Sequence, residues 1–201
     1  MNRRFTLSLA AAGLFAGAGA AHATDLNYDY VQVGYSVVDI DDVNEDISSV
    51  VIEGSFLVTD TVYLFAGYAD GETDRFSVLG TSGRLGLESY TAGAGYRYEL
   101  SPQTDVNFSA AWERQKVEGR NGFSFVGSES ENGYSVAVGM RHLVTRQFEI
   151  GADVTYIDVA DDDTILTFGA LWHITDLVAV GGSYSLGSDA DAIAGGIRFK
   201  F

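Results

Sequence analysis

Polar and apolar residues alternate at a period of two in ten short segments of this chain, and no other feature constrains its fold as strongly. In one of them, Phe148 and Ile150 alternate with Glu149 and Gly151. This is the period of a β-strand with one polar and one apolar face. The ten segments are Tyr30–Val37, Val50–Val58, Val62–Tyr68, Ser89–Tyr98, Val106–Trp112, Tyr134–Met140, Phe148–Tyr156, Leu166–Trp172, Val178–Tyr184 and Ile193–Phe201.

The connections between these segments alternate between short turns and longer acidic stretches. The short ones lie at 59–61, 101–105, 145–147 and 175–176, and the longer ones at 39–49, 69–88, 117–132, 158–163 and 186–191. Such alternation puts short turns at one end of a closed antiparallel sheet and long loops at the other, as in transmembrane β-barrels. The sequence therefore predicts an all-β, antiparallel, ten-stranded barrel, with eight strands as the alternative if 62–68 and 178–184 are loops.

The two faces of the predicted strands favour a barrel in a membrane over a soluble β-sandwich. The polar face carries glycine in eight of the ten segments, which allows tight curvature and leaves room for long inward side chains. The apolar face has aromatic residues near both ends, such as Tyr35 and Tyr134 toward the long loops and Phe56 and Trp172 toward the short turns. Two aromatic girdles around an aliphatic band are typical of strands that cross a bilayer.

The first 23 residues have the features of a secretory signal peptide. Arg3 and Arg4 precede an apolar stretch that ends before the small-residue cleavage motif 21–23. We therefore expect a signal peptide at 1–23 and a mature barrel at 24–201. Loss of the two arginines takes the formal net charge from −16 to −18, which excludes nucleic acid as a plausible partner. The chain has no cysteine, so thiol chemistry and a lipidated cysteine are excluded.

Six charged residues fall on the inward face of the predicted strands. Long charged side chains in a lumen must pair with one another, because bulk water does not reach them freely. We expect the three arginines to pair with the carboxylates in a lumen charge network. Its predicted members are Glu53, Arg97, Arg141, Glu149, Asp153 and Arg198.

Several strand motifs, including Tyr63-Leu64-Phe65-Ala66-Gly67-Tyr68, resemble those of the small outer-membrane β-barrels of proteobacteria. Within that group the pattern is most similar to the outer-membrane proteins of plant-associated bacteria once proposed as elicitors of a rice immune receptor. The resemblance implies location in the outer membrane after export, contact with lipid and lipopolysaccharide, and help from periplasmic chaperones and the barrel-assembly machinery. It also implies that Ile197, Phe199 and Phe201 form the C-terminal assembly signal.

No motif for a cofactor or an enzyme accompanies the strand pattern. His22 leaves with the signal peptide, and His142 and His173 lie beside short turns, so an outer-rim nucleophile would have no histidine base. The acidic stretches 39–46 and 161–163 lack the spacing of a calcium loop. We therefore expect a non-enzymatic protein without cofactor or dedicated metal site, with a structural or surface-interaction role through its acidic loops. The alternative is a narrow porin-like channel; the sequence names no external ligand.

Overall fold

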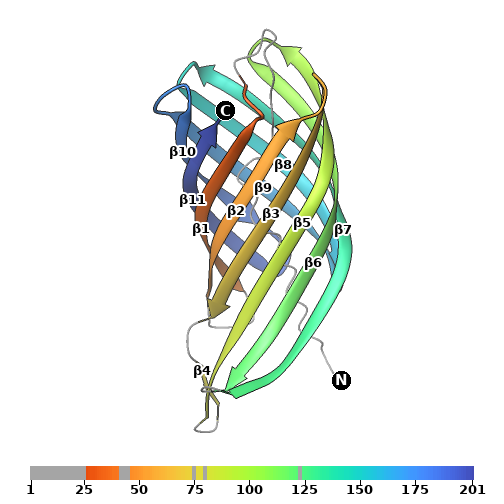
Figure 1. Ribbon diagram of the computed structural model, residues 1–201, viewed down its shortest axis with the longest axis vertical. Helices are drawn as coiled ribbons and strands as arrows, with labels where there is room; N and C mark the ends of the chain where they lie inside the picture. The colour runs from red at the N-terminus through yellow and green to blue at the C-terminus, as the bar shows by residue number, and fades with distance from the viewer. Residues whose placement is uncertain (1–25, 41–45, 74–75, 79–80, 122–123) are drawn as a thin grey trace.

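The computed structural model describes residues 26–40, 46–73, 76–78, 81–121 and 124–201, which form a closed antiparallel β-barrel (Figure 1). Ten strands make the wall, and a short extra strand, β4 (Phe76–Val78), pairs with the start of β5. The wall strands are β1 (Tyr30–Ile40), β2 (Ile47–Leu57), β3 (Val62–Thr73), β5 (Thr81–Ser101), β6 (Thr104–Asn121), β7 (Ser124–Thr145), β8 (Phe148–Val159), β9 (Asp161–His173), β10 (Val178–Leu186) and β11 (Ala190–Lys200).

Each wall strand pairs with its neighbours in the sequence, and the last strand returns to the first. β3 pairs directly with β5, while β1 and β11 pair along their whole length, from Tyr30↔Lys200 to Ile40↔Ala190. Closure matters because an unpaired strand edge inside a bilayer would leave backbone groups without hydrogen-bond partners. The prediction of ten strands is confirmed, and the alternative of eight is wrong, since residues 62–68 and 178–184 lie in β3 and β10.

The two ends of the barrel differ, as Figure 1 shows. The end that carries the C-terminus has the short turns 58–61, 102–103, 146–147 and 174–177. At the opposite end β5, β6 and β7, with 21, 18 and 22 residues, reach past the other strands. We call the part of these three strands beyond the rest of the wall the extension.

The extension corrects the predicted loops at 69–88 and 117–132. Most of these residues continue strands, because an antiparallel ladder already in register gains a backbone hydrogen bond with each added pair. Residues 69–88 and 117–132 lack the long alternation of polar and apolar residues that marks the wall strands, so the sequence analysis interpreted them as loops. The predicted loop at 158–163 is likewise a tight hairpin turn at Ala160, which adopts a left-handed φ of 67°.

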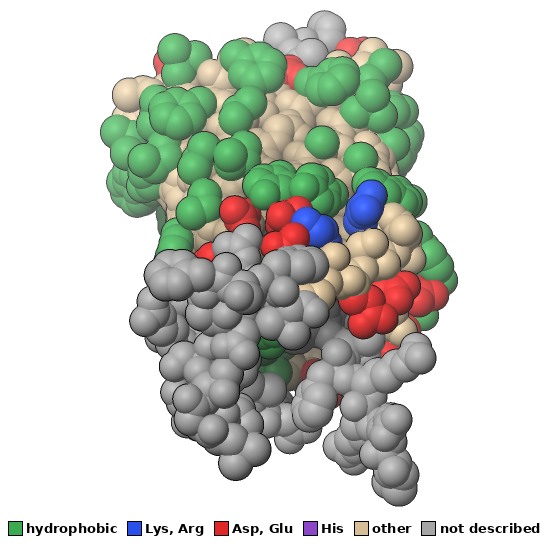
Figure 2. Space-filling view, turned by 60° about the horizontal axis from the view of Figure 1, so that its bottom comes forward, with side chains coloured by type: hydrophobic (Ala, Val, Ile, Leu, Met, Phe, Trp, Pro, Cys, Tyr) green, Lys and Arg blue, Asp and Glu red, His purple; other side chains and the backbone are tan. Residues whose placement is uncertain are grey.

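Apolar side chains cover the outside of the wall. On β7, for example, Val136, Val138 and Met140 are 45%, 44% and 48% exposed. Figure 2 shows a broad field of such side chains, with charged residues gathered toward the extension. Leaving dozens of large apolar groups in water would cost about 1.5–3 kcal/mol each, so this surface requires lipid. Among the described residues, no helix is long and apolar enough to cross a membrane.

Aromatic residues ring this surface at both ends of the apolar band. Tyr68 packs beside Tyr90, with ring centroids 5.0 Å apart, toward the extension. Phe148 packs beside Trp172, with centroids 6.1 Å apart, toward the short turns.

The core of the protein lies inside the barrel. There Tyr63 covers Gly95 so closely that any Cβ at this glycine would overlap the tyrosine ring.

Candidate functional site

The lumen is filled at the short-turn end by the segment that precedes β1. Leu26 and Tyr28 lie inside the barrel, where they pack against Tyr63 of β3 and Leu143 of β7. All four side chains are at most 3% exposed. Asp29 attaches the segment to β2 and to the end of the chain after β11. Its Oδ1 accepts a 2.8 Å hydrogen bond from Leu57 N, and its carbonyl oxygen accepts one from Phe201 N. We call residues 26–29 the N-terminal plug.

Arginine side chains hold the plug by stacking on its tyrosine. The ring of Tyr28 lies 4.7 Å from the Arg97 guanidinium and 4.5 Å from that of Arg141. Arg141 also donates two 3.2 Å hydrogen bonds to the carbonyl oxygen of Asn27. A third arginine, Arg198, stacks on Tyr30 at 3.8 Å. These cation–π contacts are strongest where water is excluded, as it is here.

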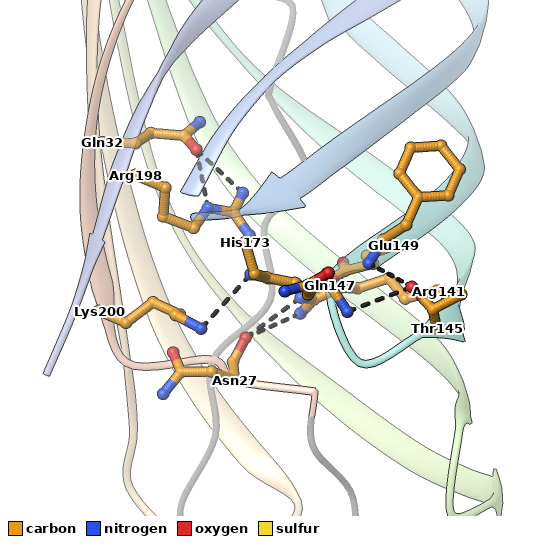
Figure 3. A network of polar contacts seen from close by, with 10 residues as sticks. Asn27, Gln32, Arg141, Thr145, Gln147, Glu149, His173, Arg198 and Lys200 are labelled. Carbon is orange, nitrogen blue, oxygen red and sulfur yellow. Dashed lines mark hydrogen bonds and ion pairs between the residues drawn. The ribbon is translucent and has the colours of Figure 1, made fainter. Parts of the chain in front are cut away.

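Carboxylates and amides complete the network around these arginines (Figure 3). Arg141 Nε donates to Glu149 Oε1 at 2.7 Å, and the two side chains are each about 2% exposed. Glu149 Oε2 also lies 3.3 Å from Nε2 of His173. The other ring nitrogen of His173, Nδ1, is 3.4 Å from Lys200 Nζ. The Arg141–Glu149 pair thus links β7 and β8 to groups on β9 and β11.

The other predicted members of the charge network have partners that the sequence did not identify. Arg97 forms a 2.9 Å ion pair with Asp105, which lies two residues from the position opposite Arg97 on the neighbouring strand β6 and is fully buried. Arg198 donates to the amide oxygen of Gln32 at 2.9 and 3.0 Å, and Gln32 in turn donates to Glu53. Asp105 was missed because it fell within the predicted turn 101–105, and Gln32 because it carries no charge.

An internal cavity of about 130 Å³ lies in the middle of the lumen. Glu53, Glu113 and Asp153 line it, together with several serine and threonine hydroxyls. Glu113 accepts hydrogen bonds from Thr91 at 2.5 Å and from Ser135 at 2.7 Å. Asp153, which the sequence placed among the arginine partners, instead accepts a 3.1 Å hydrogen bond from Thr155. The cavity is therefore lined by carboxylates and hydroxyls, with Arg141 also at its boundary.

Two clusters of buried apolar side chains lie toward the extension end of the lumen. Val38, Ile40 and Ile47 form one cluster with Leu87, Ala192 and Ala194, so residues of β1, β2 and β11 meet a residue of β5. A second cluster on β8 and β9 consists of Ile157, Val159 and Ile165. Inward Val and Ile at this level were not expected, since the strand pattern predicted a polar inner face.

The remaining predicted residues lie on the outside. Ile197, Phe199 and Phe201 are 44%, 50% and 69% exposed and face outward at the end of β11 and just beyond it. Asp161 and Asp162 are exposed near the hairpin tip. No group of three His, Cys, Asp or Glu suited to a metal ion occurs among the residues that the structure describes. The acidic residues at 41–45 lie outside that part.

Comparisons with known proteins agree with this architecture. The family model of the outer membrane protein beta-barrel domain matches residues 7–173. The NanC porin structure is similar at 9% identity and a TM-score of 0.54, covering 85% of this chain and 100% of that chain. No curated protein sequence matches.

Two further bacterial proteins are similar in structure. Ail, the attachment invasion locus protein of Yersinia pestis, is 15% identical, with 85% of this chain and 97% of that chain covered and a TM-score of 0.46. Neisserial surface protein A is 16% identical, with coverages of 86% and 96% and a TM-score of 0.47. With the family model spanning most of its length, the chain belongs to the outer-membrane β-barrel protein family.

Proposed function

We propose that this protein is a non-enzymatic barrel with a closed lumen, which serves a structural or surface-interaction role through its acidic extracellular end. The observation that carries the proposal is the filling of the lumen at two levels. The N-terminal plug fills one end, and the apolar cluster around Ile40 and Ile47 narrows the other. Ions would have to leave water to pass an apolar constriction, so this arrangement disfavours conduction.

A planar-bilayer measurement tests the closed lumen. The purified parent should show no stable conductance steps. A variant with Ile40→Gly, Ile47→Gly and Tyr28→Gly should show steps, because the substitutions remove side chains from both fillings. Its outer wall stays unchanged, and heat-modifiable migration on gels verifies that it folds. Stable steps from the parent would favour the second candidate function, a narrow porin-like channel.

The central cavity is the observation that favours this second candidate. Its 130 Å³ is enough for a few water molecules, and its carboxylates would select cations. The N-terminal plug and the apolar cluster around Ile40 and Ile47 lie toward opposite ends of the lumen, however, and we infer that conduction would require both to move. For this reason we rank the channel below the closed barrel.

We also propose a route of biogenesis for the chain. We infer that cleavage after residue 23 gives a mature chain at 24–201, whose first described residue, Leu26, lies inside the lumen. Mass determination of the mature protein should give the mass of 24–201. Export, handling by periplasmic chaperones and recognition of Phe201 by the assembly machinery belong to this proposal, as does contact of the rim with lipopolysaccharide.

The acidic rim is also where a host-facing role would reside. The narrower resemblance to outer-membrane proteins of plant-associated bacteria rests on motifs in the wall, which set the fold rather than the partner. We propose this narrower family membership on the basis of those motifs. A binding screen on whole cells, with the extension removed in the control strain, would show whether host proteins bind here.

A further inference from the structure

The extension has one strand edge without a partner in the described structure. β6 pairs with β7 as far as Ser124, whereas β8 pairs with β7 only as far as Tyr134. β8 ends there because the chain turns back into β9 at Ala160. No strand of the described residues therefore pairs with the outer side of β7 between Ser124 and Gly133. We call this segment the open edge.

The hydrogen bonds of β7 identify which residues present their backbone at the open edge. Leu143 N donates to Gln103 O at 2.9 Å, toward β6. In an antiparallel pair, alternate residues direct both N–H and C=O to the same neighbour. The register is regular from this pair to residue 127, so odd-numbered residues serve β6. Ser128, Ser130 and Asn132 consequently direct their N–H and C=O away from β6, toward the empty side.

On the face that continues the inside of the barrel, the charge beside the open edge is acidic. Glu129 and Glu131 are exposed and lie on the face that continues the inside of the barrel. An added strand beside β7 would be collinear with β8 and would abut the hairpin that carries Asp158 and Asp162. The basic residues Arg114 and Lys116 lie on the opposite face of β6, where Lys116 pairs with Glu118 and Glu88.

We propose that the open edge binds an extended, basic segment of another protein by β-strand addition. Backbone groups of Ser128, Ser130 and Asn132 would supply the hydrogen bonds, and Glu129 and Glu131 would favour lysine or arginine at alternate positions of the partner. A second copy of this chain is a poor occupant, since two acidic edges would repel each other. This inference rests on the proposed surface role and names its partner class.

Binding of a labelled peptide tests the proposal. The probe is a fluorescein-labelled decapeptide of alternating lysine and threonine, added to the folded full-length protein in detergent at low salt and followed by fluorescence anisotropy. Ser130→Pro removes one N–H from the open edge and none from the β6 ladder, and proline is tolerated at such edge positions. We expect Ser130→Pro to weaken binding about tenfold or more, while the matched control Ser130→Ala binds like the parent.

A second pair of measurements separates strand addition from simple charge attraction. Glu129→Gln with Glu131→Gln should weaken binding and flatten its salt dependence. The same peptide with alternate amides N-methylated keeps its charge but cannot form the backbone hydrogen bonds of a strand, so it should not bind the parent protein. This measurement does not depend on whether the Ser130→Pro variant folds. Equal binding of the methylated and parent peptides, or no binding by the parent, would overturn the proposal. Bilayer conductance decides the closed-lumen function independently of either result.

Discussion

Breaking the Arg141–Glu149 ion pair should strongly destabilise the barrel. Glu149→Gln keeps the shape of the side chain but removes the charge that compensates a guanidinium about 2% exposed. Removing one partner of a buried pair typically costs about 3–5 kcal/mol, because the other charge stays buried without compensation. The contacts of Arg141 with Tyr28 and Asn27 keep the guanidinium in place, so it cannot swing out to water.

The assay is urea unfolding in lipid vesicles, followed by tryptophan fluorescence. If the free energy of unfolding falls by about 2–3 kcal/mol per molar urea, a loss of about 3–5 kcal/mol in Glu149→Gln lowers the urea midpoint by about 1–2.5 M. The double variant Arg141→Met, Glu149→Gln removes both charges and should recover much of the loss, and together with the single variant Arg141→Met it gives a coupling energy. A midpoint for Glu149→Gln within about 0.2 M of the parent, or additive effects in the double variant, would refute the reasoning.

Three further outcomes follow. Gly95→Ala should lower the free energy of unfolding by about 1–3 kcal/mol, because the added Cβ overlaps the Tyr63 ring. Replacing Tyr63 by Ala as well should lessen that penalty, and an unchanged urea midpoint for Gly95→Ala would contradict the prediction. Ala160→Gly should raise the free energy of unfolding by about 1 kcal/mol, because glycine adopts the left-handed φ of 67° without strain; a lower midpoint would argue against strain at the hairpin. Ending the chain before Phe201 should reduce the folded, heat-modifiable protein in outer-membrane fractions, since it removes a lipid-facing aromatic worth about 1.5–3 kcal/mol; equal yields would refute the assembly-signal role.

The wall of the barrel could be predicted from sequence because lipid imposes a regular pattern on it. Val136, Val138 and Met140 all face hydrocarbon, so every second residue of that stretch had to be apolar. The extension has no such constraint. Residues such as Glu129 and Glu131 lie in a strand because the pairing with β6 continues. Their own β-propensity does not predict a strand there.

The inside of the barrel was only partly predictable. The inward positions of Arg141 and Glu149 followed from strand phase, but the plug did not, since Leu26 and Tyr28 precede the first alternating segment. The apolar filling was also hidden. Ile40 and Ile47 lie within 39–49, which was predicted as one of the longer acidic loops. Contacts across a lumen join residues far apart in sequence, and no periodicity encodes them.

The most direct test of the closed lumen is the accessibility of a single introduced cysteine, for which this cysteine-free chain is well suited. Ala137 lines the central cavity, and Ala137→Cys adds only a small side chain there. A charged, membrane-impermeant thiol reagent should label Ser130→Cys on the extension rapidly, but should label Ala137→Cys only after unfolding. Labelling of folded Ala137→Cys at the rate of the Ser130→Cys control would show that solutes enter the lumen, and would contradict the closed barrel.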